Sequence, residues 1–349
     1  MSSDATVLMP VPSAQPDAAA KRLALRIGFG VALGFALGEL FGTPFFFLPP
    51  LLAVQFLASM PQPPTLRQGF GVVVLVALLS GLTLLLSSAF AGQPLVFVML
   101  VGLLLFVGFL LDTAGKTMPA TVLLTLSAMI PLAAVQSMST AATLAVALVG
   151  AHAVAILTTW IAFAAFPAPS AAMPMGPREF PEASPRRAIV NTLLLFPVLL
   201  LFMIGGKMTF VVLIVIISVL RLGERGTAHG AALGLLLGNI LGGIVATIAY
   251  GFVNLQTSIV FFLLVVLLVG LVFGARIAAG SPQASLFILA LATFIILLGI
   301  GVSPLPTDSG AAFTARLWNV LLAGAYAVGA VSLTRARRPT AESAGHGFT

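Results

Sequence analysis

The residues of this chain that can do chemistry are a few charged groups within or beside long apolar segments. Only 7% of the 349 residues are charged, and a charge near the centre of a bilayer costs about 2.5–3.5 kcal/mol on insertion scales. Glu39 lies in an apolar segment, about one helical turn from its end, where its carboxyl can take up and release a proton. An interfacial glutamate that reaches water is an equally good interpretation, so the sequence leaves both open.

The remaining charged candidates lie at the ends of apolar segments. Asp112 and Lys116 are four residues apart, a spacing that permits an ion pair on one face of a helix. Arg221 and Arg225 follow an unusually short apolar segment, and Lys207 follows two glycines. Such residues can attract organic anions, or they can be ordinary interfacial and loop residues. We predict a cytoplasmic mouth at Asp112, Lys116 and Arg225, and anion contacts at Lys207 and Arg221.

A proline pair predicts where a binding site interrupts the apolar segments. Proline removes a backbone donor and breaks a helix, and unpaired backbone at membrane depth is tolerated only inside protein or beside a water-filled cavity. Aromatic residues precede this pair and add surface for a ligand, although they also suit an interfacial belt. Isolated polar residues elsewhere are either ligand contacts or satisfied interhelical hydrogen bonds. The candidates for substrate binding are Phe45, Phe46, Phe47, Pro49, Pro50, Gln55, His152, Lys207, Arg221 and Tyr326.

Composition excludes most other classes of protein. The chain is 60% hydrophobic, whereas soluble domains carry about 25% charged residues, so we expect an integral membrane protein. It has no cysteine and three scattered histidines, which predicts no metal and no cofactor. The sequence has no glycine-rich nucleotide-binding loop ending in Gly-Lys-Ser/Thr, so we expect that ATP-driven transport would need another chain. The net charge is +7, but the Lys and Arg residues lie at the ends of the apolar segments instead of forming one basic patch. We therefore expect no nucleic-acid partner.

The apolar segments predict an all-α membrane protein with twelve spans of about 20 residues each. The first six are Arg26–Gly42, Phe45–Met60, Phe70–Ala91, Pro94–Asp112, Pro119–Val135 and Thr140–Phe166, and the second six are Ala188–Gly206, Met208–Arg221, Ala228–Phe252, Thr257–Gly274, Ser281–Ile300 and Ala312–Thr334. The predicted domains are a disordered tail (1–20), a first half (21–166), a proline-rich cytoplasmic linker (167–187), a second half (188–334) and a C-terminal tail (335–349).

The basic residues predict the orientation of these spans. With the N-terminus inside, fourteen of the 16 Lys and Arg fall on the cytoplasmic side, and only Lys207 and Arg316 fall outside. Cytoplasmic loops carry the excess of Lys and Arg, so the count supports twelve spans with both termini in the cytoplasm.

The two halves look like one six-span unit used twice. Each opens with arginine, has a short second span and ends in a similar pentad, Gly-Ala-His-Ala-Val at 150–154 and Gly-Ala-Tyr-Ala-Val at 324–328. Because six is even, the repeats are parallel. Glycines four residues apart, at 30, 34, 38 and 42 and at 230, 234, 238 and 242, predict smooth helix faces that pack closely.

This pattern resembles the membrane parts of the fusaric acid resistance and aromatic acid exporter proteins, in particular a small bacterial branch of that superfamily. The likeness rests on the arginine that opens each half, the proline-broken second span and the basic loop that leads into the glycine-rich segment from Arg225 to Gly242. Larger members have a cytoplasmic domain where this chain has only the linker.

The resemblance implies a transporter in the bacterial inner membrane that exports small, mainly aromatic, carboxylic acids, driven by protons. It also implies a periplasmic adaptor protein as a partner. The alternatives are a non-transporting subunit of an efflux assembly and a membrane-embedded enzyme. We expect no enzyme, because clustered histidines, acidic pairs and nucleophile constellations are missing from the sequence.

The twelve-span topology can be tested by cysteine labelling, since the chain has no native cysteine. Arg67→Cys and Lys207→Cys are expected to react with an impermeant thiol reagent from opposite sides of the membrane. Labelling of both positions from the same side would contradict the topology.

Overall fold

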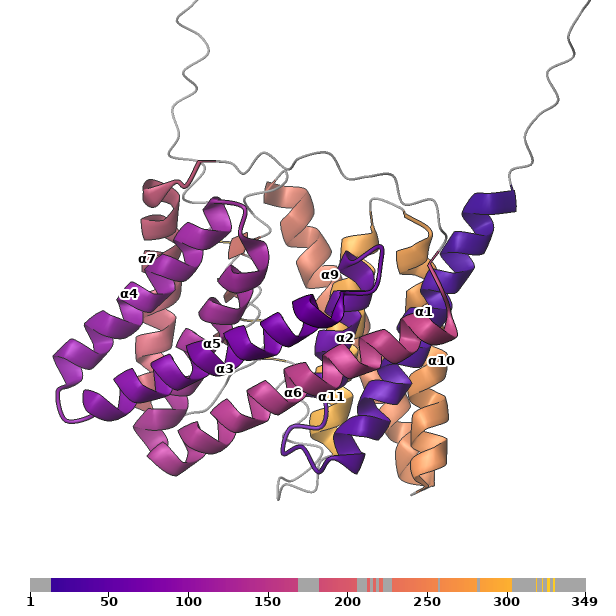
Figure 1. The fold of residues 1–349 in the computed structure, drawn as a ribbon, viewed down its shortest axis with the longest axis horizontal. Helices are drawn as coiled ribbons and strands as arrows, with labels where there is room; N and C mark the ends of the chain where they lie inside the picture. The colour runs from indigo at the N-terminus through magenta and orange to yellow at the C-terminus, as the bar shows by residue number, and fades with distance from the viewer. Residues whose placement is uncertain are drawn as a thin grey trace, which may run out of the picture.

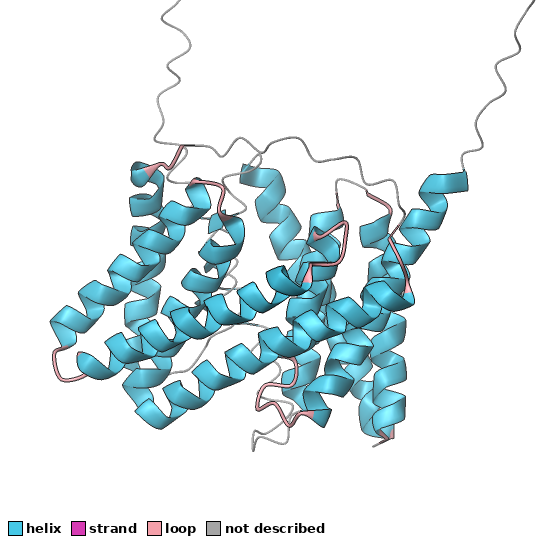
Figure 2. Ribbon diagram, in the orientation of Figure 1, coloured by secondary structure: helices cyan, strands magenta, loops and turns pink. Residues whose placement is uncertain are grey.

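The structure is a computed structural model that describes residues 14–168, 182–205, 228–256, 258–280 and 283–302, with isolated residues between 212 and 221 and between 318 and 329. Within these ranges the chain forms helices, turns and bends, and no strand (Figure 2). The helices are α1 (Ala14–Leu40), α2 (Leu48–Ser59), α3 (Leu66–Ala89), α4 (Pro94–Thr113), α5 (Thr117–Gln136), α6 (Met138–Ala165), α7 (Pro185–Gly205), α9 (Ala228–Leu255), α10 (Ile259–Ala278) and α11 (Ala284–Val302). Nine of these are long and apolar enough to cross a membrane. The described part of the chain is therefore an α-helical, multi-pass membrane protein in contact with lipid.

The ends of the helices agree with the predicted spans to within a few residues, with one exception. α1 begins at Ala14, so the last residues of the predicted tail (1–20) are helical. As a consequence, Lys21, Arg22 and Arg26 lie within the helix instead of at or before its start.

Two predicted spans are described only in part. Residues 212–213, 216–217 and 220–221 of the eighth span are helical, as are 318, 322, 325–326 and 329 of the twelfth. Lys207 and Arg225 lie outside the described residues, as do the C-terminal tail and positions 169–181 of the linker.

α2 corrects the prediction that the proline pair interrupts a helix. Phe47 is the N-cap residue, so Pro49 and Pro50 lie in the first turn, where the missing amide donors have no intrahelical partner to lose. The prolines begin the helix instead of breaking it. With 12 residues, α2 is about 18 Å long, which is shorter than the hydrocarbon core of about 30 Å. Both prolines are buried.

α5 lies between two cores and contributes a face to each. Val122, Leu126 and Ile130 belong to the larger core, which gathers residues of α1, α2, α3, α6, α9, α10 and α11. Leu124 and Leu132 belong to the smaller core, which gathers residues of α4 and α7 and residues between 212 and 220. Figure 1 shows α4, α5 and α7 on one side and α1, α2 and α10 on the other, with α3 and α6 running obliquely across them.

Glycines let several helices touch through their backbones. A Cβ on Gly270 of α10 would lie 3.0 Å from the Cα of Gly28 in α1, and a Cβ on Gly34 would lie 2.7 Å from the Cα of Pro50 in α2. In the second half, a Cβ on Gly242 of α9 would meet the carbonyl oxygen of Ala290 in α11. The prediction that both glycine series pack helices is confirmed for Gly30, Gly34, Gly238 and Gly242. Gly38 packs against the Phe46 carbonyl in the turn before α2, whereas a Cβ on Gly42 or Gly234 would meet no atom within 4 Å.

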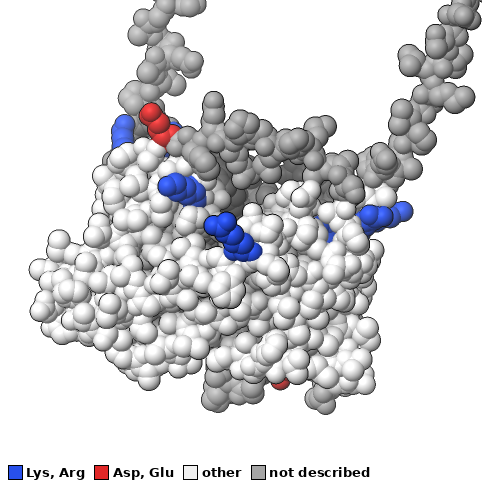
Figure 3. Space-filling model, viewed as in Figure 1, with Lys and Arg blue, Asp and Glu red and all other residues white. Residues whose placement is uncertain are grey.

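On the face of the molecule drawn in Figure 3, the Lys and Arg residues gather at one end of the helices, called here the basic end. Contacts between distant segments agree: Arg22 donates to the carbonyl of Pro167, and the Ser184 amide donates to the Thr113 hydroxyl. The start of α1, the end of α6, the end of α4 and the start of α7 therefore lie at this end. Because α1 runs away from it, Glu39 lies about 25 Å from Arg22 along the helix axis.

Filling the contact between α1 and α2 is expected to destabilise the protein. Gly34→Ala places a methyl group against the Pro50 backbone, and we expect a loss of about 1–3 kcal/mol. The control is Gly81→Ala in α3, where a Cβ would meet no atom within 4 Å, so it should be neutral or stabilise by up to about 1 kcal/mol. Thermal unfolding in detergent measures both, and equal effects would contradict the packing described.

Candidate functional site

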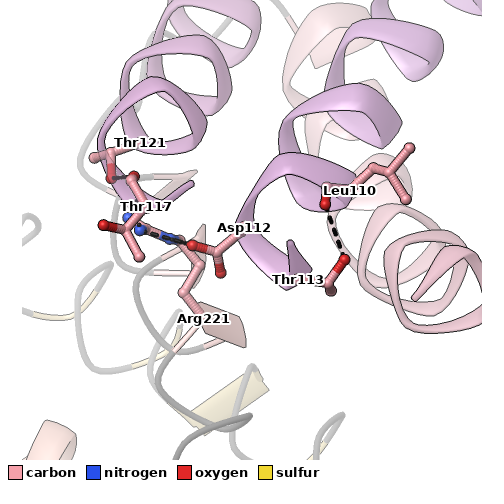
Figure 4. A network of polar contacts seen from close by, with 6 residues as sticks. All are labelled: Leu110, Asp112, Thr113, Thr117, Thr121 and Arg221. Carbon is pink, nitrogen blue, oxygen red and sulfur yellow. Dashed lines mark hydrogen bonds and ion pairs between the residues drawn. The ribbon is translucent and has the colours of Figure 1, made fainter. Parts of the chain in front are cut away.

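A buried ion pair at the basic end joins the end of α4 to Arg221 (Figure 4). Arg221 donates from Nε at 3.0 Å and from Nη2 at 2.9 Å to the same Oδ1 atom of Asp112. Nη2 also donates to the carbonyl oxygen of Thr117, at 3.2 Å. The side chain of Asp112 is 3% exposed and that of Arg221 is 16% exposed. Within the described part of the chain this is the only ion pair.

The local sequence brings three helices to this point. α4 ends at Thr113, and Gly115 has a φ of 77°, a left-handed conformation that glycine adopts without strain. This tight turn lets α5 begin at Thr117, with the Thr117 carbonyl facing Arg221. The Thr113 hydroxyl donates to the Leu110 carbonyl and accepts from the Ser184 amide just before α7. The ion pair is thus held at the meeting point of α4, α5 and the start of α7.

The physical cost of this arrangement makes it a candidate functional site. A carboxylate near the C-terminus of α4 faces the negative end of the helix dipole, so it needs a nearby cation. Removing one partner of a buried ion pair costs about 3–5 kcal/mol, whereas apolar residues of similar size are often as stable as the pair. Simple packing would serve for stability, so the pair is a candidate for a functional contact.

The partner of Asp112 differs from the one that spacing suggested. The predicted pair of Asp112 with Lys116 is wrong, because Asp112 binds Arg221 and Lys116 is exposed. Arg221, predicted as an anion contact, is occupied by this carboxylate in the structure.

The predicted aromatic candidates pack against α1 and α11. The Phe46 ring lies 5.7 Å from that of Phe35 in α1, and Phe47 contacts Gly299 of α11. Phe45 stacks edge-on against Phe47 at 6.1 Å. These residues join α1, α2 and α11 at the end opposite the ion pair, so they do not form one site with Arg221.

Glu39 is exposed near the end of α1. Two residues later, Phe41 begins the lining of a groove that sequence reasoning missed, and Glu39 itself is not part of that lining. The groove has a volume of ≈ 800 Å³. Its lining is apolar or small: Phe41, Gly42, Thr43 and Pro44 after α1, and Ala142, Thr143, Val146, Ala147, Gly150, Ala153, Val154 and Leu157 of α6. The regularly spaced small residues of α6 are the feature of the sequence from which this groove could have been predicted.

The isolated polar candidates make different hydrogen bonds. His152 is buried, and its Nδ1 lies 2.7 Å from the Leu148 carbonyl of its own helix. Tyr326 donates to the Leu194 carbonyl of α7 at 3.0 Å, an interhelical bond. Gln55 is exposed on the otherwise largely buried α2. None of them joins the ion pair, and the described residues contain no group of three metal-ligating side chains.

Arg26 is a second charged residue that sequence reasoning treated only as a topology signal. It is 4% exposed, and its Nη1 has no hydrogen-bond partner. Its Cζ lies 4.4 Å from the centre of the Phe163 ring, and its Nε donates at 3.4 Å to the Arg22 carbonyl. A cation–π contact is worth about 0.5–2 kcal/mol, whereas burying a charge costs several kcal/mol.

Comparison with known proteins gives one match. A family model described as a protein of unknown function (DUF2955) matches residues 23–162, which is less than half of the chain and runs from α1 into α6. No curated protein and no solved structure matches the chain.

The ion pair can be tested by charge removal. Asp112→Asn leaves the partly buried Arg221 without this countercharge, and we expect a loss of about 3 kcal/mol in the free energy of unfolding. The double variant Asp112→Leu with Arg221→Met should recover most of this loss, because both charges are removed together.

Lys116→Gln is the matched control for this experiment, since it removes the exposed charge four residues from Asp112. It should leave the unfolding midpoint unchanged. A loss as large as that of Asp112→Asn would instead assign the pairing to Lys116.

Proposed function

We propose that the protein is an inner-membrane exporter of small organic acids, chiefly aromatic carboxylates, driven by exchange for protons. The proposal rests on one observation above all: the body of the protein is almost free of charge, yet a buried ion pair joins Asp112 of α4 to Arg221. The resemblance to aromatic acid exporters supplies the substrate class.

The exporter is organised as twelve helices in two parallel halves, with both termini in the cytoplasm. Matching helix contacts support the repeat. In such a repeat α1 corresponds to α7, α3 to α9, α4 to α10 and α5 to α11. The contact of α1 with α10 then has its counterpart in the contact of α7 with α4. In the same way, α3 with α5 corresponds to α9 with α11, and α4 with α5 corresponds to α10 with α11. The family match, which spans α1 to α6, also follows this division.

The ion pair serves as a latch between the halves at the cytoplasmic end. Asp112 belongs to the first half and Arg221 to the second, so separating the halves must break the pair. A substrate carboxylate competes with Asp112 for the same guanidinium, and its binding therefore favours the open latch. This gives the substrate a differential affinity for two states, which alternating access requires.

Glu39 acts as the proton acceptor at the opposite end. It is exposed beside the groove between the loop after α1 and α6, so protons from outside can reach it without crossing the bundle. In this scheme the groove admits the apolar part of the substrate, since its lining is almost entirely apolar.

Flux in proteoliposomes tests the proposed function. An interior-acidic pH gradient should drive uptake of a labelled aromatic carboxylate, against the passive distribution of a weak acid. Glu39→Gln should abolish this pH-driven uptake while the protein still inserts. The control is Glu182→Gln, an exposed carboxyl before α7, which should transport normally.

Two outcomes would contradict parts of this scheme. Unchanged flux in Glu39→Gln would remove Glu39 from proton coupling. Purified protein that gives flux only with a periplasmic adaptor would make the chain a subunit of an efflux assembly.

A further inference from the structure

Arg26 is a buried guanidinium that has no countercharge among the described residues. The residue is 4% exposed, and no described carboxylate lies within ion-pair distance of it. Both N–H groups of its Nη1 lack a partner. Buried arginines are normally paired with an anion, so this residue differs from Arg221, which has Asp112.

The surroundings of Arg26 attract a cation but do not neutralise it. Phe163 of α6 presents its ring face 4.4 Å from Cζ, and the Arg22 carbonyl accepts a long bond from Nε at 3.4 Å. The C-terminus of α6 adds partial negative charge nearby. A ring quadrupole and helix carbonyls supply partial charges only, and the Nη1 donors stay free.

We propose that Arg26 is the anchor of an oxyanion-binding site at the basic end, between α1 and α6. A phosphate or carboxylate group accepts hydrogen bonds from Nη1, because the planar guanidinium fork matches both groups. Arg22 lies one turn earlier on the same face of α1, and its exposed side chain provides a second cation.

The place of Arg26 in α1 suits two sources of such an oxyanion. It lies eight residues, about 12 Å along the helix axis, inside the candidate membrane span of α1, which begins at Ala18. A lipid phosphate therefore has to enter between α1 and α6 to reach the side chain, which is packed against Phe163. A dissolved carboxylate has to reach the same Nη1 donors, which are buried in this structure.

Thermal unfolding of the full-length protein in neutral detergent tests the site with three probes: phosphatidic acid, inorganic phosphate and benzoate. A bound probe raises the unfolding midpoint by linkage. We expect Arg26→Met to weaken the apparent affinity for the active probe by about tenfold or more, through loss of charge-assisted hydrogen bonds. Arg67→Met, at an exposed arginine of the same end, should keep the wild-type response.

The probes separate the two sources, and a second variant guards against misfolding. A response to phosphatidic acid alone identifies a lipid phosphate, and a response to benzoate or inorganic phosphate identifies a solute. Arg26→Lys keeps the charge but loses the fork, so its response should be intermediate. If no probe gives a response that depends on Arg26, the site does not exist. Binding is measured without flux, so failure here leaves the exporter proposal intact.

Discussion

Close backbone contact is the interaction on which the rest of this structure depends. Lipid tails are as apolar as the side chains they touch, so helices in a bilayer gain little by burying leucine against leucine, and tight packing must hold them together. The crossings of α1 with α10 at Gly28 and Gly270, and of α9 with α11 at Gly242, provide it. These contacts fix the larger core, and through α5 they position the smaller core with its ion pair.

The charged residues divide into those that are satisfied and those that are not. Asp112 and Arg221 neutralise each other at the junction of α4, α5 and α7, while Arg26 is buried beside an aromatic ring with donors to spare. In a body with so few charges, each one acts over a long range because little water or counterion screens it. The described Lys and Arg residues, and with them the strongest local fields, lie at the basic end.

Helix positions were predictable from the sequence, whereas the site was not. Apolar length and the positions of Lys and Arg are local properties, so α4 and α9 begin where their spans were expected. The pairing of Asp112 with Arg221 joins residues 109 apart in sequence, and only the packing of α4 against α7 and its neighbours brings them together. Spacing favoured Lys116 because sequence shows only neighbours on one helix. Burial of Arg26 was equally hidden, since it depends on Phe163 of α6.

The shortness of α2 has a consequence for how the protein is made. At about 18 Å, this helix is too short to cross the hydrocarbon core by itself. We therefore do not expect it to insert as an independent transmembrane helix. Pro50 contacts Gly34, and Leu57 contacts Gly30. We therefore expect α1 and α2 to enter the bilayer together, as a helical hairpin. In this hairpin α2 packs against the glycine-containing face of α1.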